Sequence, residues 1–154
     1  MLKNARSQPT EAPTCMKRII SLTSIPPRFP LLGPTLKSLV DQGADEVRLY
    51  IPRSYRRFAA WDGTKPEVPK GVTLFCVDRD YGPATKILPA CMDLRGQDVQ
   101  LLFCDDDGNY APDWANKLFS IQADRPSDAV AGYVRPVQGY VPNPVTLLKH
   151  PKVS

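Results

Sequence analysis

The sequence predicts an α/β fold in which a mostly parallel β-sheet is flanked by helices. Short apolar runs rich in β-branched residues alternate along the chain with segments of helical periodicity. The runs are apolar throughout, as expected for strands of a parallel sheet that is covered on both faces. With 154 residues, 42% of them hydrophobic and 23% charged, the chain suits one globular domain with its own core.

Five apolar runs are predicted as strands, at 18–24, 46–52, 72–78, 99–104 and 128–137. Most have the length of an ordinary buried strand and are bounded by proline, glycine or charged residues. Helix-like segments separate most of the runs, and strand–helix–strand units form parallel sheets. Ligands bind at the carboxyl ends of such strands, so the turns after the first, third and fourth runs are the candidate site.

The segment 31–42 is predicted as the first helix, because its apolar residues recur at helical spacing. Pro34 near its start suits the first turn of a helix. The apolar face consists of Leu32, Leu36, Leu39 and Val40. The segment 53–71 is broken by prolines and is expected to be a loop with one short helical piece.

Two further helices are predicted, at 81–94 and 111–122. Pro83 and Pro112 lie near the starts of these segments. A proline suits the first turn of a helix, because the backbone N–H groups there have no partner within the helix. Pro89 lies inside the first of these segments and is expected to kink or end the helix.

Residues 1–15 are predicted as a flexible tail, because they are polar and contain prolines, and the domain is expected to span 16–154. The tail lacks the apolar centre of a secretion signal, and no run approaches the roughly 20 apolar residues of a membrane-spanning helix. The four cysteines have no metal-ligand spacing, and His150 is the only histidine. These features predict free thiols, a cytoplasmic location and no transmembrane segment.

The formal charge of +4 suits a small anionic ligand, and no block of lysines and arginines is dense enough to favour nucleic acid. No nucleic-acid partner is therefore expected. The tightest basic cluster consists of Arg53, Arg56 and Arg57, and it is interpreted as a solvated face.

The sequence LLFCDDDGNYAPDW (101–114) places three adjacent aspartates directly after an apolar run. Two carboxylates about 4 Å apart repel by roughly 4 kcal/mol near a protein surface. In an extended chain Asp105 and Asp107 point to the same side, where they could hold Mg²⁺ or Mn²⁺ together with substrate phosphates. Asp106 would face the other way, toward solvent, a ribose hydroxyl or a basic side chain. A solvated acidic turn that caps the next helix is the alternative.

The turns after the first and third runs carry groups that suit an anion. In GPATK (82–86), Gly82 allows close approach of a ligand, and Pro83 leaves the following amides free to attract phosphate beside Lys86. In SIPPR, Arg28 could reach the same ligand. A helix cap and a rigid connection, respectively, are the alternatives.

The sequences IISLTSIPPRF, DRDYGPATKILPA and LLFCDDDGNYAPDW, in this order, resemble nucleotide-sugar glycosyltransferases of the GT-A fold. The likeness covers roughly residues 17–135 and is greatest to small members with a GPATK element before a D-x-D-type motif. It implies a Rossmann-like GT-A domain over 16–154, in which Mn²⁺ or Mg²⁺ holds the diphosphate of a sugar donor. Few residues follow the acidic motif, so the acceptor-binding part is expected to be short or incomplete, and a partner protein could complete it.

By position, the resemblance implies that Asp105 and Asp107 are the metal ligands and the catalytic residues. The implied donor-binding residues are Thr23, Ser24, Pro26, Arg28, Asp80, Gly82, Pro83, Lys86 and Asp106. The donor, the acceptor and the stereochemistry of transfer stay open.

Two other functions compete with the glycosyltransferase. LLFCDDDGNY also resembles the motif of haloacid-dehalogenase-type phosphatases, in which Asp105 would be the nucleophile, Asp107 the acid/base and Mg²⁺ the cofactor. That motif usually opens its domain, whereas here it lies late in the chain. The other alternative is a non-catalytic remnant that binds a nucleotide sugar without transfer.

Overall fold

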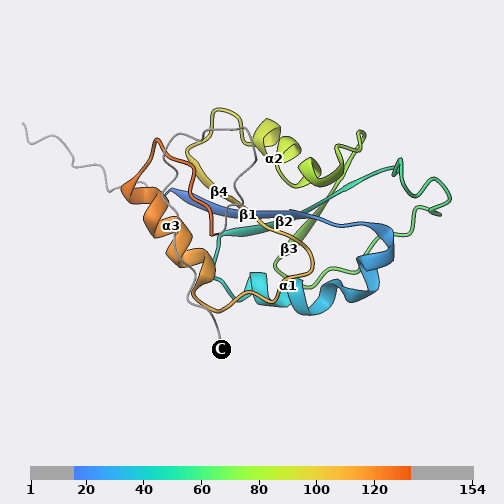
Figure 1. Ribbon diagram of the computed structural model, residues 1–154, viewed down its shortest axis with the longest axis horizontal. Helices are drawn as coiled ribbons and strands as arrows, with labels where there is room; N and C mark the ends of the chain where they lie inside the picture. The colour runs from blue at the N-terminus through green and yellow to red at the C-terminus, as the bar shows by residue number, and fades with distance from the viewer. Residues whose placement is uncertain (1–15, 133–154) are drawn as a thin grey trace, which may run out of the picture.

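A computed structural model describes residues 16–132, and its centre is a four-stranded sheet (Figure 1). The strands lie in the order β3-β2-β1-β4, and every neighbouring pair is parallel. Their bounds are Lys17–Thr23 (β1), Glu46–Pro52 (β2), Val72–Val77 (β3) and Val99–Phe103 (β4). The predicted α/β fold with a parallel sheet is confirmed, and each of these strands lies within about one residue of its expected bounds.

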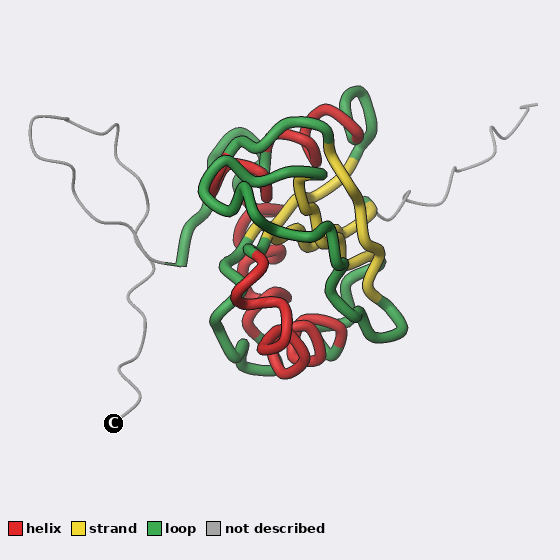
Figure 2. Tube along the Cα trace, turned by 90° about the vertical axis from the view of Figure 1, so that its right-hand side faces the viewer, coloured by secondary structure: helices red, strands yellow, loops and turns green. Residues whose placement is uncertain are grey.

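Helical segments cover both faces of this sheet. The 3₁₀ helix η1 (Pro26–Leu31) leads into α1 (Leu32–Val40), and the 3₁₀ helix η2 (Gly82–Lys86) leads into α2 (Leu88–Asp93). Helix α3 (Trp114–Asp124) follows β4. The strands lie between α1 and α2 in Figure 1, and the turned view of Figure 2 likewise shows helices on both sides of the strands.

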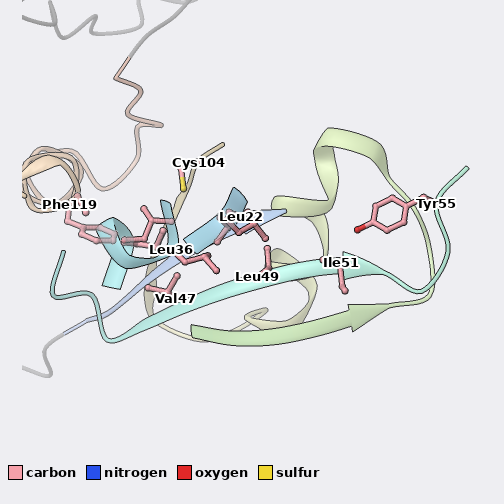
Figure 3. Packing of buried hydrophobic residues seen from close by; sticks show 12 residues of the cluster. Leu22, Leu36, Val47, Leu49, Ile51, Tyr55, Cys104 and Phe119 are labelled. Carbon is pink, nitrogen blue, oxygen red and sulfur yellow. The ribbon is translucent and has the colours of Figure 1, made fainter. Parts of the chain in front are cut away.

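The core lies between the sheet and helices α1 and α3. Register pairs Ile20 with Val47 and Leu22 with Leu49, so the apolar side chains of adjacent strands form continuous rows on one face. Helices α1 and α3 cover these rows with side chains that include Leu36 and Phe119 (Figure 3). Each such fully buried side chain stabilises the fold by about 1.5–3 kcal/mol relative to exposure. The predicted apolar face of the first helix is therefore its core face.

The opposite face of the sheet is covered by η2 and α2. Ser21 Oγ donates a hydrogen bond to the carbonyl of Lys86 at 2.6 Å, and the Tyr50 hydroxyl donates to Asp93 at 2.8 Å. Ile19 on the same face is fully buried. Since the central strands are buried on both faces, their sequences are apolar without alternation.

Three sequence expectations differ from the structure. The predicted helix 81–94 is two helices that meet at Ile87, and Pro89 lies in the first turn of α2, so this proline begins a helix and does not end one. The loop 53–71 contains hydrogen-bonded turns, but no helix is found in it. Residues 128–132 form no strand, and the rest of the predicted strand 128–137 lies outside the described residues.

The predicted tail, residues 1–15, also lies outside the described residues. Within 16–132, no helix combines the length and the apolar character needed to cross a membrane.

Candidate functional site

The turns that follow all four strands meet at a cavity of about 270 Å³, which we call the edge pocket. It lies at the carboxyl ends of the strands, which is where open parallel sheets bind ligands. The chain order of the strands also reverses here, because β1 has β2 on one side and β4 on the other. Nine predicted site residues line this pocket: Thr23, Ser24, Arg28, Asp80, Gly82, Pro83, Lys86, Asp105 and Asp106.

Two predicted site residues, Pro26 and Asp107, are not among the residues that line the edge pocket. Pro26 faces a second cavity of about 570 Å³ on the other side of η1, beside Phe29 and Trp61. Asp107 is 60% exposed and pairs with Arg28, whose Nη2 lies 3.2 Å from Asp107 Oδ2.

Asp105 and Lys86 form an ion pair within the edge pocket. The Nζ atom of Lys86 lies 2.5 Å from Asp105 Oδ1, although the carboxylate is 72% exposed and the lysine only 17%. The hydrogen bond from Ser21 holds the Lys86 backbone against β1. The lysine side chain lines the pocket from this position. The ion pair brings together two turns that are 19 residues apart in the chain.

Tyr110 fixes the backbone of Asp105 from the other side. Its hydroxyl donates to the Asp105 carbonyl at 2.8 Å and accepts from the Asp105 amide at 3.1 Å. Gly108 makes this fold-back possible, because a Cβ atom at residue 108 would lie 2.9 Å from the Tyr110 ring. The ring also packs on Trp114, with 4.3 Å between centroids. The glycine and tyrosine of DDDGNY therefore position Asp105, a role that the sequence analysis missed.

Asp106 is the buried carboxylate of the three, and its side chain is 8% exposed. It accepts hydrogen bonds from the Ser24 hydroxyl and from Arg28 Nη1, the latter at 2.6 Å. This hydrogen bond and the charge of Asp106 raise the pKa of Arg28 above its ordinary value. Of the orientations expected for Asp106, the structure has the one toward a basic side chain, and it fixes Arg28 at the pocket.

The expected pairing of Asp105 with Asp107 around one ion has only partial geometric support. The two carboxylates contact different cations, Lys86 and Arg28, and among residues 16–132 no three His, Cys, Asp or Glu side chains gather to hold a metal ion.

Asp105 fits the role of a ligand, because its carboxylate is exposed at the pocket. Asp106 does not fit, since both its oxygens accept hydrogen bonds. Mg²⁺ and Mn²⁺ commonly use one or two carboxylates with substrate phosphates.

The GPATK turn reaches the pocket with a geometry that differs from the expected one. Gly82 has φ of 59°, a left-handed conformation that favours glycine. The amide of Ala84 donates to the Tyr81 carbonyl at 3.3 Å and is not free, and the Thr85 hydroxyl is buried and accepts from the Tyr81 amide. This turn therefore does not present free helix amides to a ligand. Its charged contribution to the pocket is the side chain of Lys86.

Asp80 ties two turns of the pocket together. Its carboxylate accepts from the amide of Arg56 at 2.9 Å and from the amide of Gly82 at 2.7 Å. The turn after β2 is thereby fastened to the turn after β3. Asp80 lines the pocket as predicted, and its hydrogen bonds give it a positioning role.

The turn after β2 forms a side of the pocket that no sequence pattern indicated. Tyr55, Arg57 and Phe58 line it, although they lie in a segment that was interpreted as a loop and a solvated basic face. The Tyr55 hydroxyl donates to the Ser24 carbonyl at 2.9 Å, and burial raises the pKa of Tyr55 above its ordinary value. Tyr55 is also a member of the hydrophobic core cluster, and Figure 3 shows it at the end of that cluster where the arrowhead of β3 lies.

A nucleophilic cysteine is not supported near the pocket. Cys104 directly precedes the aspartates, but burial raises the pKa of its thiol to about 12, so it stays protonated at neutral pH. The only histidine, His150, lies outside the described residues.

No family model matches the chain, and no curated protein matches it. The argument for a function therefore depends on the geometry and charges of the edge pocket.

Proposed function

We propose that the edge pocket binds a nucleoside-diphosphate sugar and that the protein is a glycosyltransferase of the GT-A type. The observation that carries this proposal is the meeting of Lys86, Arg28 and Asp105 in one cavity at the carboxyl ends of parallel strands. Cations suit the diphosphate, and an exposed carboxylate beside them suits a divalent ion that accompanies it. The three sequence segments that carry Arg28, Lys86 and Asp105 also follow one another in the order that resembles GT-A glycosyltransferases, which supports the same class of ligand.

In this proposal the residues of the chain bind and orient the donor. Lys86 and Arg28 take up negative charge of the diphosphate, and Asp106 with Ser24 holds Arg28 in the required orientation. Asp105 holds Mn²⁺ or Mg²⁺, with Asp107 as a second carboxylate that would have to leave Arg28. When bound, the ion neutralises the charge that develops on the leaving nucleoside diphosphate.

The phosphatase alternative is less well supported. It requires Asp107 to act as an acid/base beside a substrate on Asp105, whereas Asp107 lies outside the lining of the edge pocket and pairs with Arg28. Inhibition by vanadate of a phosphatase activity that Asp105→Asn abolishes would favour it over the transferase.

A cytoplasmic location is also part of the proposal. Cys76, Cys91 and Cys104 are free thiols, which is usual in a reducing compartment. We also propose that a partner protein could supply part of the acceptor-binding site.

The test is a thermal-shift screen of UDP-, GDP- and CMP-sugars with and without Mn²⁺, followed by a turnover assay with the donor that binds. A ligand at 100 times its dissociation constant stabilises a protein by about 2.7 kcal/mol. We expect a shift that requires Mn²⁺, and release of nucleoside diphosphate in the turnover assay. Binding without turnover would instead identify a non-catalytic nucleotide-sugar-binding protein, and no shift with any donor would contradict the proposal.

A further inference from the structure

The cations that line the edge pocket differ in whether a carboxylate pairs with them. Three cations line it, namely Arg28, Lys86 and Arg57. Arg28 lies 2.6 Å from Asp106, and Lys86 lies 2.5 Å from Asp105, so each of these two cations is neutralised by a carboxylate. Within residues 16–132 Arg57 forms no ion pair, and its contact is with the Phe58 ring, 5.8 Å from the guanidinium carbon to the centroid.

Asp80, the third carboxylate of the lining, forms no ion pair with Arg57. Asp80 uses both oxygens to accept backbone amides, one from Arg56 and one from Gly82. Arg57 is thus the cation of the pocket lining whose guanidinium donors are not committed to a carboxylate within residues 16–132. An anion can bind Arg57 without first breaking an ion pair, whereas Arg28 and Lys86 would have to exchange a carboxylate for it.

The loop that carries Arg57 is held by hydrogen bonds to the end of β3 and to the turn after β1. The amide of Arg53 donates to the Val77 carbonyl at 2.8 Å, and its guanidinium contacts Asp78 at 2.8 Å. The Tyr55 hydroxyl bonds the Ser24 carbonyl. The rings of Tyr55 and Phe58 pack edge to face, 6.1 Å between centroids. The backbone of Arg57 is therefore held in place before a ligand arrives, which lowers the entropic cost of binding.

We propose that Arg57 binds a phosphate group of the ligand and that Tyr55 and Phe58 form the aromatic side of the same subsite. The inference rests on the proposed function and adds a phosphate-recognition residue to it. A guanidinium presents paired donors that match phosphate oxygens, and a planar group of a nucleotide can pack beside the two rings. The basic cluster that was interpreted as a solvated face is then divided: Arg57 faces the pocket, whereas Arg53 and Arg56 secure the loop.

The test compares Arg57→Gln with Arg56→Gln in the full chain, by titration calorimetry with UDP and with inorganic pyrophosphate, both with Mn²⁺ present. Arg56 is the matched control, because it is an adjacent exposed arginine outside the pocket lining; its backbone bond to Asp80 survives the substitution, and only a long contact of 3.5 Å from its guanidinium to the Asp80 carbonyl is lost. Loss of a charged hydrogen bond predicts about tenfold or more weaker binding of both probes to Arg57→Gln. Arg56→Gln should change either dissociation constant by less than about twofold.

The outcomes separate this inference from the proposed function. If the unsubstituted protein binds either probe and Arg57→Gln binds it equally well, the role of Arg57 is wrong while the pocket assignment stands. If the unsubstituted protein binds neither probe but a nucleotide sugar shifts its melting temperature in the screen, the Arg57 subsite fails while the proposed function stands; if nothing binds in either experiment, both fail. Melting without ligand should be the same for both variants, since both side chains are exposed, and this measurement separates lost binding from lost folding.

Discussion

Two clusters of ionic side chains lie on this small sheet, and they differ in what surrounds them. The amino-end cluster, near the starts of β1 and β2, consists of Lys17, Glu46, Arg48 and Asp93. The pocket cluster, at the carboxyl ends of the strands, consists of Arg28, Lys86, Asp105, Asp106 and Asp107. Both combine lysine, arginine and carboxylates, so composition alone does not tell them apart.

The amino-end cluster is packed against aromatic rings. The side chain of Arg48 is 11% exposed, lies 2.9 Å from Glu46 and covers the Phe75 ring at 5.0 Å. Phe75 in turn stacks on Tyr50, whose hydroxyl is bonded to both Arg48 and Asp93. The charges of this cluster pair with one another, as in a structural network, although the buried Arg48 Nε makes no hydrogen bond within the described residues. In the pocket cluster, exposed carboxylates and a half-exposed Arg28 face a cavity. A cavity next to fixed, accessible charges is the better sign of a binding site.

The largest effect on stability is expected from Arg48→Ala in the amino-end cluster. This change leaves Lys17 as the ion-pair partner of Glu46 and exposes Phe75, so the free energy of unfolding, measured in urea, should fall by about 2 kcal/mol. Arg53→Ala is the control, because Arg53 pairs with Asp78 in solvent, and it should cost less than about 1 kcal/mol. Equal costs for the two variants would contradict the distinction between the clusters.

The largest effect on binding is expected from the double variant Asp105→Asn/Asp107→Asn. It removes the carboxylates proposed to hold the metal, so Mn²⁺-dependent binding of the donor found in the screen should weaken by about 100-fold, roughly 2.7 kcal/mol. Stability should change by less than about 1 kcal/mol, because both carboxylates are largely exposed.

The matched control for this double variant is Asp113→Asn. Asp113 is an exposed aspartate at the start of α3 that pairs with Lys117, outside the edge pocket. Binding should be unchanged in Asp113→Asn, because residue 113 is not in the pocket lining. The fold should also be retained, because asparagine suits the start of a helix as well as aspartate does. Metal-dependent binding that persists in the double variant would remove the acidic motif from the site.

Lys86→Ala should have a smaller effect on binding. Loss of one charged contact to the diphosphate predicts about tenfold weaker binding, measured by calorimetry, while Arg28 and Arg57 still attract the ligand. The variant should fold, since Ser21 bonds the backbone of residue 86 and not its side chain. Lys70→Ala, an exposed lysine outside the pocket lining, should bind normally. Equal affinity of the two variants would count against a phosphate-binding Lys86.

The smallest effect is a pH dependence that belongs to the amino-end cluster. Burial by itself would raise the pKa of Glu46, but hydrogen bonds from Arg48 and Lys17 outweigh it and hold the pKa below its ordinary value. A carboxyl with a lowered pKa stabilises the fold above its unfolded-state pKa, and the contribution is lost as pH falls through the folded-state pKa. The cost of Glu46→Gln in thermal melts should therefore be largest near neutral pH and shrink toward pH 3. A cost that grows on acidification would contradict this sign.

The pattern of apolar runs and turns was enough to predict the fold class and the edge of the sheet at which the pocket lies. Continuous apolar runs between proline and glycine turns identified the four strands, because strands covered on both faces need apolar side chains in both directions. Parallel strands place their carboxyl ends at one edge. The turns carrying Arg28, Lys86 and Asp105 were therefore expected to meet, and they do.

Which charges pair, and which stay available to a ligand, follows from the packing of the turns and could not be predicted from the sequence. The chain bends at Asp106 and Asp107, so Asp106 turns inward to Arg28, while Asp105 and Asp107 contact different cations. Arg57 is brought to the pocket by a loop with no periodic pattern, held by bonds to residues more than twenty positions away. Local spacing specifies repeating backbone structure, whereas contacts between irregular turns depend on where the packed sheet places them.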